Sequence, residues 1–187
     1  NHKDIRAYKG YLFGAQFAPD NPLYPFKRLQ ESTILVFTRN PEKKARLLLA
    51  LGSARAKEIE EMAEKGKTTY LQGLAQSYEK TMQDNAKILD SLKGKLSITP
   101  LLLETDKEVA KHLLTFEEVS AQVPVQAVPV INKALTGAES VVDKVADVAG
   151  RPAVPQDLVA RLSGYKAQGL LSEEEVNKIV GALTREE

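Results

Sequence analysis

Few residues of this chain have the types and spacing that catalysis requires. Nucleophilic catalysis needs an activated cysteine, or a serine with a neighbouring base and an oxyanion hole. The sequence has no cysteine, two histidines and no Gly-x-Ser-x-Gly motif. His2 lies in a segment without periodicity, and His112 lies beside an apolar stripe at helical spacing, which favours a core-boundary residue over a base or a ligand. The sequence therefore predicts no catalytic residue and a protein that is not an enzyme.

Metal and phosphate binding have equally little support in the residue pattern. The di-metal helical bundles place a glutamate three residues before the histidine, whereas Glu108 precedes His112 by four. Four glutamates gather in one predicted helix: Glu58, Glu60, Glu61 and Glu64. We interpret them as a solvated face, because charged side chains are mostly exposed. The sequence also lacks a glycine-rich phosphate loop, so it predicts no metal and no cofactor.

The most distinctive segment is PDNPLYPFKRL, residues 19–29, which we call the proline motif. Proline fits the first turn of a helix, so Pro25 predicts a helix start with Phe26 and Leu29 on one face. We expect Tyr24, Phe26 and Leu29 to be buried and to fix the turn into this helix. The residues given this structural role are Pro22, Leu23, Tyr24, Pro25, Phe26, Lys27, Arg28 and Leu29.

The two cations of the proline motif allow two interpretations. Lys27 and Arg28 could bind an anion at the helix start, where backbone N–H groups point outward. The interpretation we favour has Arg28 packing its stem over Tyr24 and pairing with a carboxylate.

Composition limits the remaining functions. The 187 residues carry 26 cationic and 25 anionic side chains, so the net charge of +1 gives no electrostatic argument for binding nucleic acid. No apolar run approaches the roughly 20 residues of a membrane-spanning helix. The chain starts at Asn1 and lacks cysteine, which is compatible with an exported protein whose signal peptide has been removed.

Apolar residues recur at spacings of three and four through most of the chain, which predicts amphipathic helices. Asn40 is a good capping residue, Gly66 suits a helix end, and Thr99 is expected to cap a later helix. The predicted helices cover about residues 22–38, 40–66, 68–93, 99–123 and 129–149. Asn85 lies within one apolar stripe, where it either specifies register or occupies a partly exposed edge. The predicted fold is all-α, an antiparallel bundle of four to five long helices over residues 22–149.

Both ends of the chain lie outside this predicted bundle. Residues 1–21 lack helical spacing and predict an extended N-terminal arm. Its large apolar side chains are Tyr8, Tyr11, Leu12, Phe13 and Phe17. They need cover, and we predict self-association through them, with folding back along a groove of the bundle as the alternative. Residues 150–155 form a linker, and residues 156–187 predict a C-terminal helical hairpin that docks on the bundle or on another copy.

The proline motif and the following helix, NPEKKARLLLALGSARAKEIEEMAEKGK over Asn40–Lys67, resemble a prokaryotic domain-of-unknown-function family. Its pattern has a Pro-Asp-Ser-Pro-Leu-Tyr-Pro-x-Lys-Arg-Leu opening and a later Val-Pro-x-x-Ala motif, found here within Val123–Leu135. The resemblance covers about residues 19–149 and implies a helical bundle, an extracytoplasmic location and no enzymatic activity. The C-terminal segment, with its Gly-Leu-Leu-Ser-Glu-Glu-Glu centre, is similar to short helical-hairpin oligomerisation modules.

Together these observations predict an exported, non-enzymatic structural or interaction protein. We expect a homo-oligomer, without a nucleic-acid partner or a membrane span, that associates with the cell envelope or forms an extracellular filament-like assembly. An extracytoplasmic ligand-sensing module and a metal-binding helical bundle are the alternative hypotheses.

Overall fold

The computed structural model describes residues 17–95 and 98–150. Its helices are α2 (Tyr24–Phe37), α3 (Pro41–Glu64), α4 (Leu71–Ser91), α5 (Thr99–Gln122) and α6 (Val128–Val148), with the short 3-10 turns η1 (Thr68–Tyr70) and η3 (Val125–Ala127). These described ranges contain no strand. The predicted all-α bundle is therefore confirmed. Most of the predicted arm and linker and all of the predicted hairpin lie outside the described residues.

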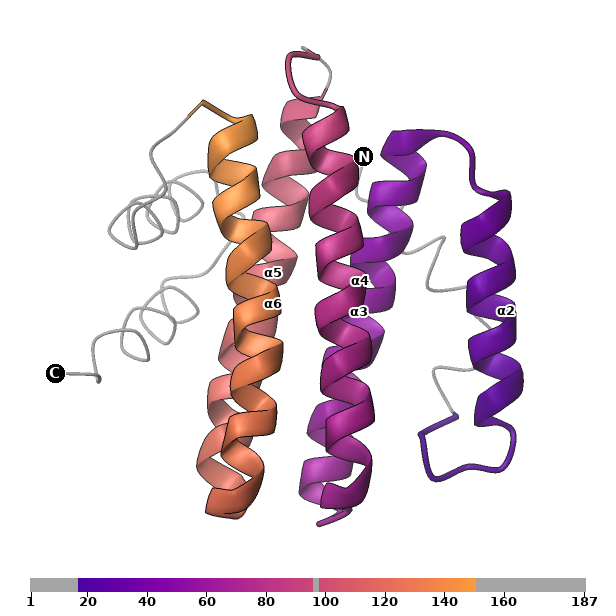
Figure 1. Cartoon of the computed structure of the whole chain (residues 1–187), viewed down its shortest axis with the longest axis vertical. Helices are drawn as coiled ribbons and strands as arrows, with labels where there is room; N and C mark the ends of the chain where they lie inside the picture. The colour runs from indigo at the N-terminus through magenta and orange to yellow at the C-terminus, as the bar shows by residue number, and fades with distance from the viewer. Residues whose placement is uncertain (1–16, 96–97, 151–187) are drawn as a thin grey trace, which may run out of the picture.

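Helices α3, α4, α5 and α6 form a four-helix body, and α2 stands at its edge beside α3 (Figure 1). Within the body, α4 contacts α3 and α6, and α5 contacts the same two helices. Helices that follow one another along the chain run antiparallel, whereas α4 and α6 run in the same direction, as do α3 and α5. Helices α4 and α5 therefore lie on a diagonal of the body, and the connection between them crosses it. In an up-and-down bundle each helix would instead lie beside the one that follows it along the chain.

Local sequence signals set most helix ends as predicted. The Asn40 side chain accepts a hydrogen bond from the Lys43 N–H at 3.0 Å, and Gly66 turns the chain out of α3 with φ of 65°. Thr99 is an exception, because Ile98 already has helical dihedral angles and takes the capping position of α5 without a side-chain hydrogen bond. The prediction that Thr99 caps this helix is wrong.

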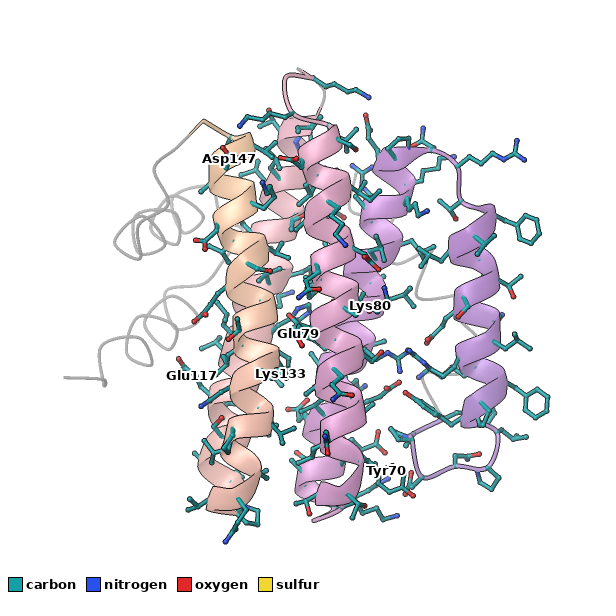
Figure 2. All side chains as sticks on the ribbon, viewed as in Figure 1. Tyr70, Glu79, Lys80, Glu117, Lys133 and Asp147 are labelled. Carbon is teal, nitrogen blue, oxygen red and sulfur yellow. The ribbon has the colours of Figure 1, made fainter. Side chains whose placement is uncertain are left out.

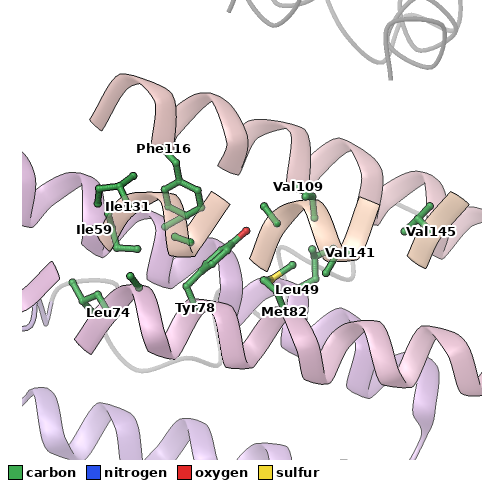
Figure 3. Packing of buried hydrophobic residues seen from close by; sticks show 14 of the residues in the cluster. Leu49, Ile59, Leu74, Tyr78, Met82, Val109, Phe116, Ile131, Val141 and Val145 are labelled. Atoms are coloured by element: carbon green, nitrogen blue, oxygen red, sulfur yellow. The ribbon is translucent and has the colours of Figure 1, made fainter. Parts of the chain in front are cut away.

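The core fills the space between the four helices of the body (Figure 3). Tyr78 and Phe116 form an edge-to-face aromatic pair with ring centroids 4.8 Å apart. The aliphatic residues packed in the same cluster include Leu49, Ile59, Leu74, Met82, Val109, Ile131, Val141 and Val145. Helix α6 approaches α4 closely at Gly137, where an added Cβ would lie 2.9 Å from the Glu79 Cα. Lys133 reaches the Glu79 carboxylate at 3.9 Å along the same contact (Figure 2).

Asn85 lies inside this core and has no exposed surface. Its side-chain amide donates to the Ala45 carbonyl of α3 at 2.8 Å. The alternative of a partly exposed edge is therefore excluded. The Asn85 Oδ1 atom is buried without a hydrogen-bond partner, so it is the bond from Nδ2 to the Ala45 carbonyl that ties α4 to α3 at a single register.

Candidate functional site

Helix α2 differs from the helices of the body in the side chains that it buries. Lys27 and Glu31 are 6% and 3% exposed, whereas Phe26 and Leu29 are 69% and 66% exposed. The prediction that Phe26 and Leu29 are buried is wrong, and only Tyr24 of the three packs, half-buried, against the core. The part of the prediction that concerns the helix start is correct, since proline occupies the first turn of α2.

A cluster of charges holds α2 on α3. Lys27 and Glu31 of α2 and Arg55 and Glu58 of α3 form what we call the ionic cluster. Lys27 Nζ lies 2.6 Å from Glu58 Oε1, and Arg55 pairs with both Glu31 and Glu58. All four side chains are almost completely buried. Two cations and two carboxylates thus compensate one another, which is the condition under which charge is tolerated away from water.

Tyr24 adds a hydroxyl group to the ionic cluster. Its O–H donates to Glu58 Oε2 at 2.8 Å, and Lys27 and Arg55 lie over its ring at 5.7 Å and 5.8 Å from the centroid. Burial raises the pKa of the Tyr24 phenol well above its ordinary value; the Glu58 carboxylate adds to this effect and Arg55 opposes it. Tyr24 therefore remains a hydrogen-bond donor through the ordinary pH range.

The two cations of the proline motif serve this contact between helices. Lys27 is paired with Glu58, so its charge is compensated inside the protein. Arg28 donates to Glu31 Oε2 at 3.1 Å and to Ser77 Oγ of α4 at 2.8 Å. The prediction that Arg28 pairs with a carboxylate is confirmed, whereas the cations found over the Tyr24 ring are Lys27 and Arg55. Lys27 and Arg28 both help to hold α2 in place.

The α3 side of the ionic cluster contradicts one prediction from the sequence. The prediction that Glu58 lies on a solvated face is wrong, because Glu58 is 4% exposed and accepts three hydrogen bonds from α2 and α3. A signal for this second buried face is present in the sequence. Leu47, Leu51 and Arg55 follow one another at a spacing of four and lead to Glu58, and all four are buried. Because α3 is buried on two sides, it needs a neighbouring helix on each side. Helix α2 covers the side of α3 that carries Arg55 and Glu58.

The opposite side of α2 is apolar and turned away from the body. We define the outer face of α2 as Phe26, Leu29, Ser32, Thr33, Val36 and Phe37. Val36 and Phe37 are 75% and 77% exposed, and side chains along this edge stand away from the body in Figure 2. The charged residues of α2, which are Lys27, Arg28 and Glu31, all lie outside this face. A surface helix normally shows the opposite polarity, so the outer face carries four exposed large apolar side chains, with Ser32 and Thr33 between them, that lack cover within the described chain.

A second polar group lies inside the body. The Tyr78 hydroxyl is 2.9 Å from His112 Nδ1, and His112 Nε2 is 2.9 Å from Ser53 Oγ. Ser53 Oγ also lies 3.2 Å from the Leu49 carbonyl oxygen and 3.4 Å from Glu108 Oε2, and either oxygen can accept its proton. One assignment fits these contacts: Tyr78 donates to Nδ1, the Nε2–H donates to Ser53, and Ser53 donates to Leu49 or Glu108. Burial raises the pKa of Tyr78 well above its ordinary value, in agreement with its role as a donor.

With this tautomer of His112, the arrangement does not activate Ser53 as a nucleophile. A catalytic base accepts the serine proton, whereas in this assignment the His112 Nε2–H donates to the serine oxygen. Ser53 lies in the middle of α3, where backbone N–H groups are used within the helix and cannot form an oxyanion hole. His112 is 4% exposed and is a core residue, as predicted. The Ser53–His112–Tyr78 group therefore joins α3, α5 and α4.

The remaining predicted residues lie mostly at the start of the chain. Tyr8, Tyr11, Leu12 and Phe13 of the predicted arm are outside the described residues. Phe17 is half-buried, and its carbonyl accepts a hydrogen bond from Lys27 Nζ at 3.4 Å. Pro22 and Leu23, just before α2, are exposed.

Two further kinds of site, metal centres and membrane spans, concern the described residues. Within 17–95 and 98–150, no three histidine, aspartate or glutamate side chains converge on a position that could hold a metal ion. In the same ranges, no helix combines the length and the apolar character needed to cross a lipid bilayer.

Comparison with known protein families assigns a family to most of the described chain. Residues 16–126, more than half of the 187 residues, match the family described as Domain of unknown function (DUF5667). The resemblance to a helical family of unknown function is thereby confirmed. The matched range begins before the proline motif and ends in η3, so α6 lies beyond it. No curated protein and no solved structure matches the chain.

Proposed function

We propose a role in assembly for this chain, which belongs to the DUF5667 family of domains of unknown function. In this proposal the protein is not an enzyme, and copies of it associate through the outer face of α2. The observation that carries the proposal is the reversed polarity of α2, which buries Lys27 and Glu31 and exposes Phe26 and Phe37. Large apolar side chains that gather exposed on one side of a helix are a feature of interaction sites.

The ionic cluster determines which side of α2 is turned outward. Rotating α2 to bury Phe26 and Leu29 would leave Arg55 and Glu58 of α3 buried without their partners from α2. Removing one partner from a buried ion pair costs about 3–5 kcal/mol. Helix α2 therefore cannot cover its apolar side by turning over on its own body, and the cover has to come from elsewhere.

The composition of the outer face suits a protein partner. Interface centres are depleted of charge and enriched in aromatic side chains, which supply much of the binding energy. The outer face has an aromatic residue near each end, Phe26 and Phe37, and none of its six residues is charged. A surface without charge cannot select a strongly charged partner such as nucleic acid, but it can pair with a second copy of itself.

The proposal also places this assembly outside the cytoplasm, at the cell envelope or in a filament-like structure. The resemblance noted for the proline motif supports this location. Detection of the protein by antibody in culture medium, surface extract and protoplast cytosol of the source organism would test it. Recovery from protoplast cytosol alone would contradict the location and leave the self-association to be judged separately.

Sedimentation velocity over a wide concentration range tests the self-association. A contact made by one helix is small compared with the roughly 1,200–2,000 Å² of stable interfaces, so association should appear as the protein concentration rises. We expect Val36→Ser to weaken it and Phe26→Ser with Phe37→Ser to abolish it. Val125→Ser is the matched control, because Val125 in η3 is also 82% exposed but lies outside α2. A wild-type chain that stays monomeric at all concentrations would refute the proposal.

A further inference from the structure

The ionic cluster can respond to acid, because protons can remove its negative charges and leave its positive charges in place. We propose that it is an acid-sensitive latch: protonation of Glu31 and Glu58 releases α2 from α3 while the four-helix body stays folded. The proposal concerns the inner side of α2 and does not depend on the proposed association through its outer face.

Helix α2 relies on charge for its contact with α3. The two residues that it buries are Lys27 and Glu31, whereas each helix of the body buries a row of apolar side chains. Tyr24, Ile34 and Leu35 of α2 are only half-buried, and the large side chains of its outer face are exposed. Loss of the charge pairing would therefore leave α2 with little buried apolar surface to hold it.

The two carboxylates of the ionic cluster receive hydrogen bonds from both helices. The carboxylate of Glu58 is faced by Lys27 from α2 and by Arg55 from its own helix. The Tyr24 hydroxyl of α2 donates to the same group. The carboxylate of Glu31 is faced by Arg55 from α3. All these neighbours are donors, which suits ionised carboxylates because they only accept hydrogen bonds.

The groups at the edge of the cluster add no negative charge. Arg28 on α2 donates to Glu31 and to Ser77 of α4, and its side chain is 41% exposed. When both carboxylates take up protons, no anion remains among the described groups that face them. Lys27 and Arg55 are then two buried cations at one contact. A buried charge without a partner is strongly destabilising, so the contact that holds α2 becomes repulsive.

The body is built to remain folded without α2. Its core is held by apolar contacts of residues such as Leu49, Tyr78 and Phe116, which protons do not weaken directly. Residues 38–40 join α2 to α3, and Thr38 and Asn40 have extended backbone there. Because the Asn40 side chain caps α3, the N-terminus of α3 keeps its own cap when α2 leaves.

Hydrogen exchange of the full chain, expressed as protection relative to an unstructured peptide at the same pH, tests the latch. The variant Glu31→Gln with Glu58→Gln removes both negative charges and nearly keeps the shape of the side chains. At neutral pH we expect the amides of α2 to lose protection on the order of a hundredfold, the effect of a buried charge without its partner, while those of α4 keep theirs. Glu104→Gln is the matched control and should leave α2 unchanged, because the pair of Glu104 with Arg46 is partly exposed.

A charge-free variant separates the latch from a general weakness of α2. It combines Lys27→Met, Glu31→Met and Arg55→Met with Glu58→Gln, which keeps an acceptor for the Tyr24 hydroxyl. Replacing buried ion pairs by apolar side chains of similar volume is often neutral or stabilising. We expect this variant to protect α2 at neutral pH and also at about pH 3, below the value of about 4.3 at which free glutamates titrate. The wild type should have lost protection in α2, but not in α4, under the same acid conditions.

Three results would overturn the proposal. The first is full protection of α2 in Glu31→Gln with Glu58→Gln, and the second is loss of protection in α2 and α4 together as the wild type is acidified. The third is a charge-free variant that releases α2 in acid as readily as the wild type. If circular dichroism shows that the double glutamine variant does not fold, the acid comparison of wild type with the charge-free variant decides alone. Failure of the latch leaves the proposed association standing, because sedimentation measures it separately.

Discussion

The four-helix body and α2 place their charged and apolar residues in opposite ways. The body buries Tyr78 and Phe116 in its core and leaves lysines such as Lys80 exposed. Helix α2 buries Lys27 and Glu31 against α3 and leaves its phenylalanines exposed. The body is thus held together by apolar contacts that no partner can reach, whereas α2 is attached by charge and keeps its apolar side available.

This difference separates stability from interaction. Burial of apolar side chains is the main source of folding free energy, so the body should account for most of it. A buried ion cluster is a weak source of net stability, but it fixes orientation because its partners fit in one arrangement. We therefore expect substitutions in the body to change unfolding and substitutions on the outer face of α2 to change association.

The largest expected effect is the difference in unfolding free energy between variants of two phenylalanines, one buried and one exposed. Phe116→Ala removes a ring that has no exposed surface and should lower the free energy of unfolding by about 3–5 kcal/mol. Phe37→Ala removes a ring that is 77% exposed and should change it by no more than about 0.5 kcal/mol at low protein concentration. Urea denaturation measures both. A large loss of stability in dilute Phe37→Ala would show that this ring is buried within the monomer.

The second prediction breaks the ionic cluster. Arg55→Met leaves Glu31 and Glu58 buried without their shared cation and should cost about 3–5 kcal/mol in the contact of α2 with α3. Hydrogen exchange should show loss of protection in α2 while the core of α4 remains protected. Arg46→Met is the control, because the Arg46–Glu104 pair is partly exposed and such pairs contribute about 0–1 kcal/mol. Equal effects of both substitutions would mean that α2 does not depend on the ionic cluster.

The sequence predicts the body well because each of its helices has one apolar side. The stripe of Leu74, Tyr78 and Met82 on α4 is buried as the spacing indicates. For α2 the same reasoning fails. Phe26 and Leu29 share one side of the helix and Lys27 and Glu31 share the other, so periodicity identifies two sides without showing which one faces the body.

The side that α2 buries is decided by residues far away in the sequence. Arg55 and Glu58 create a charged position on α3 that only charges of α2 can compensate. The stripe of Leu47, Leu51 and Arg55 leads to Glu58 and indicates a second buried face on α3, but it does not show which helix covers that face. The diagonal connection between α4 and α5 is equally hidden, since a short loop constrains direction but not which neighbour a helix packs against.

The third prediction concerns the spacing of helices within the body. Gly137→Ala places a Cβ 2.9 Å from the Glu79 Cα, so α6 must move away from α4. Overpacking of this kind costs about 1–3 kcal/mol. Gly73→Ala is the control, because a Cβ there meets nothing within 4 Å and a helical glycine replaced by alanine stabilises by about 0.5–1 kcal/mol. If Gly137→Ala were also stabilising, α4 and α6 would have room to approach differently in solution.

The smallest expected effect is the contribution of the buried Tyr78 hydroxyl to the pH dependence of stability, which appears only in alkaline solution. Burial raises the pKa of Tyr78 in the folded protein, while in the unfolded chain it has its ordinary value of about 10. The unfolded state therefore loses this proton first, so the contribution of Tyr78 to stability is complete below about pH 10 and decreases as the pH rises further. The slope approaches about 1.4 kcal/mol for each pH unit. Because lysines titrate in the same range, the quantity to measure is the difference in unfolding free energy between wild type and Tyr78→Phe. That difference should decrease from pH 10 upward, since the variant lacks the titrating hydroxyl. A difference that does not depend on pH would mean that the Tyr78 phenol ionises equally in the folded and unfolded states. The centre of the body would then be open to water.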